Sequence, residues 1–109
     1  MRAILCGANG AMGKLIDGIL GDEIVGRVSI DGENGVSKTF EELGTVQADV
    51  LIDFSHHTAI TDVLSYAKKI GCAAVIGTTG HTAEEKELIF TAAKEIPVFY
   101  SGNMSLGIA

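Results

Sequence analysis

Proline, tryptophan, cysteine and basic residues are all scarce in this sequence of 109 residues. A single proline excludes a proline-rich linker, and the 14 glycines are spread along the chain rather than gathered into a flexible segment. The two cysteines, Cys6 and Cys72, lie too far apart for a CxxC redox motif or a zinc knuckle. We therefore expect one ordered domain with two reduced, buried thiols.

Positive charge is also limited, since 8 Lys and Arg residues face 14 Asp and Glu residues and leave a net charge of −6. Such a surface repels nucleic-acid phosphates and anionic membranes, so we expect neither as a partner. No apolar run approaches the roughly 20 residues of a membrane-spanning helix, and the N-terminus leads into a strand rather than a signal peptide. We expect a cytoplasmic protein.

Hydrophobic residues make up 47% of the chain, enough for one core, so residues 1–109 are expected to form a single domain. Short apolar runs alternate with segments in which apolar residues recur at helical spacing. Strands are expected at residues 2–6, 23–30, 50–52, 73–76 and 98–100. This alternation predicts an α/β fold with a doubly wound parallel sheet, Rossmann-like in type.

Glycines at three-residue intervals follow the first expected strand, and a helix follows them. Glycine tolerates positive φ and lets a ligand reach the backbone, while the start of a helix attracts anions. The turn therefore predicts a pyrophosphate site. Its spacing departs from the usual G-x-G-x-x-G at Asn9 and Met12, so a glycine-rich turn of some other doubly wound fold remains an alternative.

Asp31 ends the second expected strand, where an acid in a dinucleotide-binding fold accepts hydrogen bonds from the adenosine ribose. The alternative is that Asp31 and Gly32 only open a turn. A carboxylate at this position repels a 2′-phosphate and favours NADH over NADPH. Lys38, in the loop that follows, leaves NADPH open.

Polar loops also follow the later strands, at the sheet edge where ligands bind in open α/β folds. The segment Gly77-Thr78-Thr79-Gly80 offers hydroxyl groups and unhindered amides that suit the sugar and amide of a nicotinamide. Three histidines fall in these loops, but adjacent histidines point apart in an extended chain and no cysteine joins them at ligand spacing. We expect no metal site, and we expect His81 to be exposed.

Four blocks, in this order and at these spacings, carry a resemblance to a known family: residues 7–13, Asp53-Phe54-Ser55, Gly77-Thr78-Thr79-Gly80 and residues 101–107. Together they resemble the N-terminal nucleotide-binding domain of dihydrodipicolinate reductase over nearly the whole chain. The resemblance implies an oxidoreductase of lysine and diaminopimelate biosynthesis, which reduces a cyclic dihydrodipicolinate precursor to tetrahydrodipicolinate. It also implies NADH or NADPH as cofactor, since family members often accept both.

The resemblance further implies a path for the cofactor. The pyrophosphate would be held by the backbone of Gly7, Ala8, Asn9, Gly10, Ala11 and Met12. Asp31 would bind the ribose. Phe54 and Ser55 would line the path, and Gly77, Thr78 and Thr79 would contact the nicotinamide half. The nicotinamide would be covered by Ser101, Gly102, Asn103 and Met104.

In the family a later domain supplies the catalytic histidine motif, the substrate-binding residues and the sheet that builds the homotetramer. The resemblance therefore implies no catalytic residue among these 109 residues, cofactor binding without turnover, and a monomer or weak dimer. Two alternatives remain open at this point. One is a stand-alone nucleotide-sensing or CoA-binding module, and the other is the first domain of another two-domain dehydrogenase.

Overall fold

The structure is a computed structural model that describes residues 1–29 and 36–100. Five of the residues predicted to bind the cofactor lie outside this described part: Asp31, Ser101, Gly102, Asn103 and Met104.

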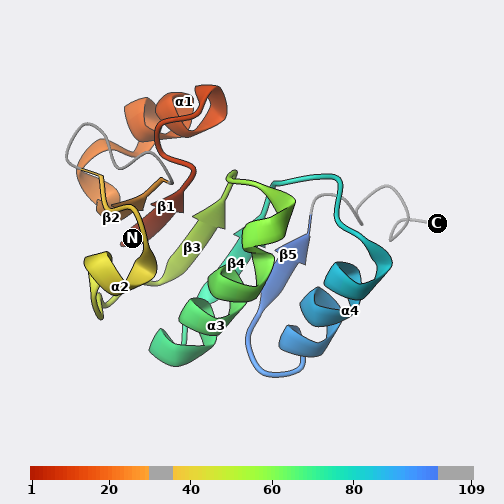
Figure 1. Cartoon of the computed structure of the whole chain (residues 1–109). Coiled ribbons are helices and arrows are strands. Elements are labelled where there is room, and N and C mark those ends of the chain that lie inside the picture. The colour runs from red at the N-terminus through yellow and green to blue at the C-terminus, as the bar shows by residue number, and fades with distance from the viewer. Residues whose placement is uncertain (30–35, 101–109) are drawn as a thin grey trace.

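Five parallel strands form one sheet: β1 (Ala3–Cys6), β2 (Ile24–Val28), β3 (Val50–Asp53), β4 (Ala73–Ile76) and β5 (Val98–Tyr100). Their order across the sheet is β2-β1-β3-β4-β5 (Figure 1). The chain moves outward to β2 after β1, and then crosses back to place β3 on the other side of β1. This reversal is the topological switch point of a doubly wound sheet, and the predicted fold class is confirmed.

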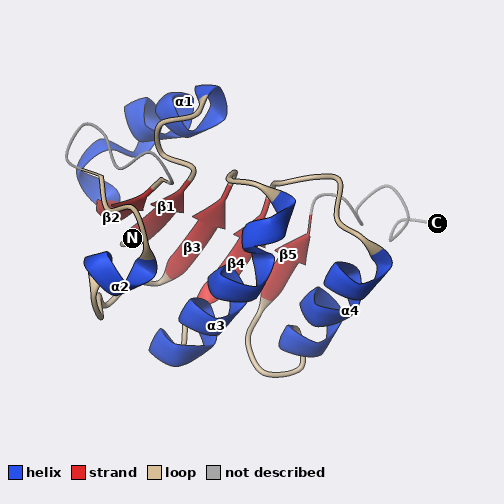
Figure 2. Ribbon diagram, viewed as in Figure 1, coloured by secondary structure: helices blue, strands red, loops and turns tan. Residues whose placement is uncertain are grey.

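In the described part of the chain, four helices and two short 3-10 turns connect the strands. The helices are α1 (Ala11–Leu20), α2 (Phe40–Leu43), α3 (Ile60–Ile70) and α4 (Ala83–Ala92), and the 3-10 turns are Gly21–Glu23 and His57–Ala59. α2, α3 and α4 pack on one face of the sheet, and among the described helices α1 alone covers part of the other (Figure 2).

Alternation along each strand divides the core between these two layers. Ile4, Leu51 and Ile76 point toward α3 and α4 and are fully buried, whereas Leu5 points toward α1. Each such side chain stabilises the fold by about 1.5–3 kcal/mol relative to an exposed position. Because all five strands run parallel, their carboxyl ends lie along one edge of the sheet.

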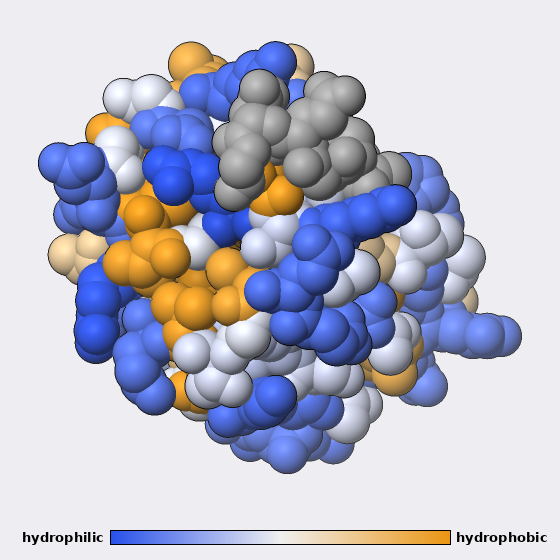
Figure 3. All heavy atoms as spheres, turned by 60° about the vertical axis from the view of Figure 1, so that its left-hand side comes forward, coloured by the Kyte–Doolittle hydropathy of each residue, from blue (hydrophilic) through white to orange (hydrophobic). Residues whose placement is uncertain are grey.

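Apolar side chains also reach the surface. Figure 3 shows a hydrophobic area bordered by hydrophilic side chains on the face that comes forward when the side of α1, β2 and α2 is turned to the viewer. Phe99 of β5 is 64% exposed, next to the buried Tyr100. None of the helices in the described part of the chain has the length and apolar character that crossing a membrane requires.

Candidate dinucleotide-binding site

The turn between β1 and α1 is built by hydrogen bonds that use part of its own backbone. Gly7 has a φ of +80°, and its amide donates to the carbonyl of Val28 at 2.8 Å. The Ala8 amide donates to the same oxygen at 3.3 Å, and the Gly10 amide donates to the Gly7 carbonyl at 3.0 Å. These three amides fix the shape of the turn. The donors that helix geometry leaves for a ligand are the first amides of α1, those of Ala11 and Met12, which have no partner inside the helix.

Two glycines in this turn stand where no side chain fits. A Cβ on Gly13 would lie 2.0 Å from the Gly7 carbonyl oxygen, so α1 packs directly on the turn that precedes it. A Cβ on Gly7 would lie 2.5 Å from the carbonyl oxygen of Phe54, in the loop after β3. Hence the start of α1, the glycine turn and the β3 loop are in backbone contact.

The β3 and β4 loops are packed together in the same way. A Cβ on Gly77 would lie 2.2 Å from Cε1 of the Phe54 ring, so the ring lies directly over the glycine backbone. The Gly77 amide donates to the carbonyl of Asp53 at 2.8 Å, and the Thr78 hydroxyl donates to the same carbonyl at 3.3 Å. Thr78 is buried and Thr79 is exposed, so only Thr79 offers its hydroxyl to solvent.

Asp53 joins these loops, a role that its position in the sequence does not predict. Its side chain is fully buried, and Oδ1 accepts hydrogen bonds from the Ser55 amide at 3.0 Å and from the Ser55 hydroxyl. Burial raises the pKa of this carboxyl, and the hydrogen bonds from Ser55 oppose that rise. The signal in the sequence was an acid at the end of an otherwise apolar strand, which can be either a ligand or a buried anchor.

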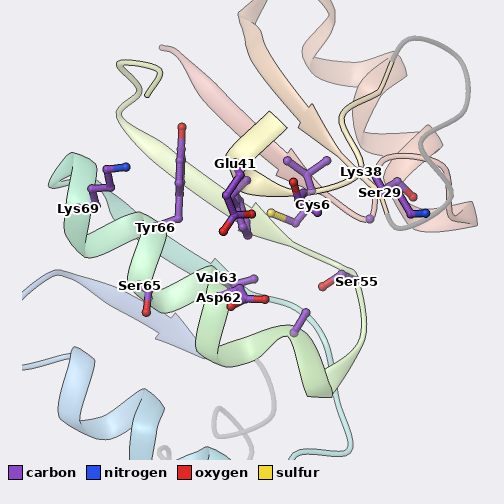
Figure 4. Close-up of a pocket in the computed structure, with 15 residues that line it drawn as sticks. Cys6, Ser29, Lys38, Glu41, Ser55, Asp62, Val63, Ser65, Tyr66 and Lys69 are labelled. Carbon is purple, nitrogen blue, oxygen red and sulfur yellow. The ribbon is translucent and has the colours of Figure 1, made fainter. Parts of the chain in front are cut away.

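A pocket of about 370 Å³ lies beside the glycine turn, between the ends of β1 and β2 and helices α2 and α3. Gly7 and Ser55 both line it, so the structure brings together two of the predicted cofactor residues (Figure 4). Ser29 and Lys38 line the same pocket from the β2 side. Such a volume suits part of a cofactor of this class.

Ala8 and Asn9 face a different hollow, of about 540 Å³, on the α1 side of the turn. Its other walls include Arg27 and Asp17, which form an ion pair of 2.6 Å. The hydrogen bond from Arg27 holds the pKa of the Asp17 carboxyl below its usual range. The predicted turn residues are therefore divided between the two sides of the turn.

His81 is buried, with 7% of its surface exposed, and the expectation of an exposed side chain was wrong. Its Nδ1 lies 3.3 Å from the Tyr100 hydroxyl, and its Nε2 is buried without a hydrogen-bond partner among residues 1–29 and 36–100. Burial lowers the pKa of the ring. Local polarity suggested exposure, but the end of β5 covers the ring, which is a tertiary effect.

The neighbouring His57 forms a separate pair, with Nδ1 2.8 Å from the carboxylate of Glu85. That carboxylate also accepts from the Thr82 amide at 2.8 Å and completes the capping box of α4. Within the described residues, no three His, Cys, Asp or Glu side chains come close enough to share a metal ion.

Comparison with known proteins gives the same family as the resemblance of the four sequence blocks. A sequence profile described as "Dihydrodipicolinate reductase, N-terminus" matches residues 1–104. The chain is 40% identical to a 4-hydroxy-tetrahydrodipicolinate reductase of Caldanaerobacter subterraneus, over 99% of this chain and 45% of that protein. It is 39% identical to one of Campylobacter jejuni, over 94% of this chain and 41% of that protein.

A third relative, also a 4-hydroxy-tetrahydrodipicolinate reductase, comes from Ralstonia pickettii and is 38% identical over 99% of this chain and 48% of its own length. The chain thus spans slightly less than half the length of these curated relatives. Because the profile covers nearly all of its residues and the glycine turn, the β3 loop and the β4 loop pack together as described, the chain belongs to the dihydrodipicolinate reductase family, whose N-terminal part it matches.

Proposed function

We propose that this chain is the NAD(P)H-binding domain of a 4-hydroxy-tetrahydrodipicolinate reductase of the lysine and diaminopimelate pathway. The observation that carries the proposal is the packing at the switch point, where Gly13 lies against Gly7 and Gly7 lies against the Phe54 backbone. A helix that starts directly after a close-packed glycine turn at such a point is the arrangement that admits a pyrophosphate.

The residues at this edge fit a nicotinamide dinucleotide. The first amides of α1 would hold the pyrophosphate, and the pocket lined by Gly7, Ser29 and Ser55 would take the adenosine half. The nicotinamide half would extend toward Gly77 and Thr79, past the Phe54 ring, and toward the predicted segment Ser101–Met104. When bound, the reduced nicotinamide supplies a hydride. The role of this chain is to bind and orient the cofactor.

Two further statements belong to the proposal. NADH is bound somewhat more tightly than NADPH, because the predicted ribose ligand Asp31 is an acid. These 109 residues alone bind cofactor without turning over substrate, because they correspond to less than half of the relatives' length. Reductase activity from the 109 residues would contradict the second statement, and a stable tetramer in light scattering would contradict the expected monomer or weak dimer.

The test compares NADH, NADPH, CoA and ATP as ligands in thermal shift and titration calorimetry. A cofactor at 100 times its Kd adds about 2.7 kcal/mol to the free energy of unfolding. We expect the shift from both nicotinamide cofactors. A larger shift from CoA or ATP would instead indicate a module of another class.

A charge variant locates the binding. Met12 is 47% exposed in the first turn of α1, and Met12→Glu places a carboxylate where the pyrophosphate is expected, at a helix end that tolerates acids well. We expect NADH to bind at least about tenfold more weakly, with no loss of thermal stability. Ile19→Glu, at the far end of the same helix and 73% exposed, is the control and should bind NADH as the unchanged chain does. Equal binding by all three proteins would contradict the placement of the pyrophosphate.

A further inference from the structure

The loop after β3 holds the hydroxyl of Ser55 in a fixed direction. This hydroxyl donates to Oδ1 of Asp53, and the Ser55 amide donates to the same oxygen at 3.0 Å. Phe54, which lies between them, is held to the sheet because its amide donates to the Cys6 carbonyl at 3.0 Å. An aspartate side chain that accepts from the backbone two residues on forms a defined turn, so the position of Ser55 is set by Asp53.

Asp53 also determines which partner keeps the proton of this hydrogen bond. An ionised carboxylate accepts hydrogen bonds and cannot donate them. Burial raises the pKa of the Asp53 carboxyl, whereas the hydrogen bonds from Ser55 lower it and so favour the ionised form. The other oxygen, Oδ2, is buried without a hydrogen-bond partner in residues 1–29 and 36–100, so a proton placed on it would find no acceptor there. The proton therefore stays on Ser55, in the bond to Oδ1.

Ser55 consequently offers the pocket a hydrogen-bond acceptor. A serine hydroxyl has one proton and two lone pairs, and the proton of Ser55 is already donated to Asp53. Ser55 is half-buried and lines the pocket proposed for the adenosine half of the cofactor. Asp62, also in the lining, is drawn on the same side of the pocket as Ser55 in Figure 4, and its carboxylate is another acceptor. This side of the pocket therefore suits a ligand group that donates.

Adenosine carries such donors on its base and on its sugar. The adenine amino group and the ribose hydroxyls can each donate a hydrogen bond, whereas the oxygens of an ionised phosphate only accept. A phosphate oxygen placed against Ser55 would bring two acceptors together without a proton between them. The hydroxyl of Ser55 therefore fits the base or the sugar of the nucleotide and disfavours its phosphates.

We propose that Asp53 is a positioning residue for the cofactor. It keeps the Ser55 hydroxyl as an acceptor, and Ser55 in turn selects a hydrogen-bond donor on the adenosine half, either the adenine amino group or a ribose hydroxyl. The inference rests on the proposed function, since it assigns a role within the same cofactor site. The Asp53 side chain is fully buried, so it acts on a ligand only through Ser55.

The experiment uses ADP and three analogues that each lack one donor. In inosine diphosphate an oxygen replaces the adenine amino group, while 2′-deoxy-ADP and 3′-deoxy-ADP each lack one hydroxyl. Calorimetry measures their Kd for the 109-residue chain and for Ser55→Ala. ADP should bind to Ser55→Ala about fivefold more weakly or worse, and one analogue should bind at least as tightly as it does to the unchanged chain. That analogue identifies the donor as the amino group or as one of the hydroxyls.

Variants of Asp53 test the positioning role. The amide of Asp53→Asn can donate to Ser55, which frees the hydroxyl proton to turn toward the pocket. The preference for ADP over the same analogue should therefore fall by a similar factor, and Asp53→Thr, which suits a strand and can also donate, should repeat the fall. The double variant Asp53→Asn/Ser55→Ala should bind ADP within about twofold of Ser55→Ala, because both changes act through one hydroxyl.

Asp49→Asn is the matched control. Asp49 lies just before β3, and its Oδ2 accepts from the Arg2 amide at 2.8 Å, so this variant alters a similar carboxylate at the other end of the same strand. It should leave every Kd unchanged. The inference would be overturned, with the proposed function left standing, if Ser55→Ala reduced no preference, if both Asp53 variants kept the preference that Ser55→Ala loses, or if Asp49→Asn reduced it equally. Failure of the unchanged chain to bind either NADH or ADP would overturn both.

Discussion

Gly13 and Gly18 lie in the same helix, and the same substitution should have opposite effects at the two positions. A Cβ on Gly13 would meet the Gly7 carbonyl oxygen at 2.0 Å and the Ala8 Cα at 2.9 Å, both backbone atoms. A Cβ on Gly18 would meet nothing within 4 Å. Since carbon contacts are favourable only near 3.5–4.0 Å, about 1 Å or more of separation is needed at Gly13 and none at Gly18.

The magnitudes follow from these contacts. Gly18→Ala should stabilise the chain by up to about 1 kcal/mol, because alanine is the better helix former and the unfolded chain loses freedom. Gly13→Ala gains the same helix propensity but forces α1 away from the turn, and overpacking of this kind costs about 1–3 kcal/mol or more. We expect a net loss of about 1–2 kcal/mol, which for a domain of this size lowers Tm by roughly 5–15 °C.

Urea unfolding followed by circular dichroism measures the free energy of unfolding of both variants. Titration of the folded variants with NADH measures the affinity of the proposed site. Gly13→Ala should also weaken the binding of NADH, because it displaces the first amides of α1. The Gly18→Ala protein should bind NADH as tightly as the unchanged chain. A Gly13→Ala protein as stable as Gly18→Ala would refute the reasoning, since it would mean that the helix and the turn are not in the close contact described.

Two further predictions concern the β4 side of the edge. Gly77→Ala should push the Phe54 ring, whose Cε1 lies 2.2 Å from the position of the new Cβ, into the cofactor's path; calorimetry should show a loss of NADH affinity larger than the loss of stability, and equal losses would contradict this. His81→Gln should change the pH dependence of stability. Burial lowers the pKa of the folded ring below 6.5, so the unfolded chain takes up the proton first and the free energy of unfolding falls as the pH drops below that value. Urea titrations between pH 7.5 and 5.5 should therefore show that the free energy of unfolding falls more steeply with decreasing pH for the original chain than for the variant. The same pH dependence in both proteins would contradict the role of burial.

The strands could be predicted because they are short apolar runs, which in β1 are buried along their whole length, and α3 because its buried residues recur at helical spacing. Residues 73–76 and 98–100 were expected as strands, and β4 and β5 have these bounds. The second strand was expected at 23–30, whereas β2 ends at Val28. An apolar run alone does not tell where pairing stops, because that depends on the partner strand, and β1 ends at Cys6, which lies opposite Val28.

The site was predictable only where a residue's local chemistry decides its role. Glycine turns and loops at strand ends were expected at the edge, and the structure places them there. The buried roles of Asp53 and His81 depend on which elements cover them, and a short polar loop gives no sign of that cover. The Thr78 hydroxyl is a similar case, because it is buried and donates a hydrogen bond to the Asp53 carbonyl, while Thr79 remains exposed.

The glycine turn departs from the usual dinucleotide pattern in spacing, yet the structure shows two of the three physical features that the pattern requires. Gly7 makes the tight turn with its positive φ, and Gly13 permits the close approach of α1. Gly10, the N-cap of α1, is exposed, and under the proposed function it would take the role of the second glycine, the close approach of the pyrophosphate to the backbone. Asn9 is then an inserted residue of the turn rather than a lost glycine. The spacing of the motif can therefore vary while the tight turn and the close packing of the helix on it are retained.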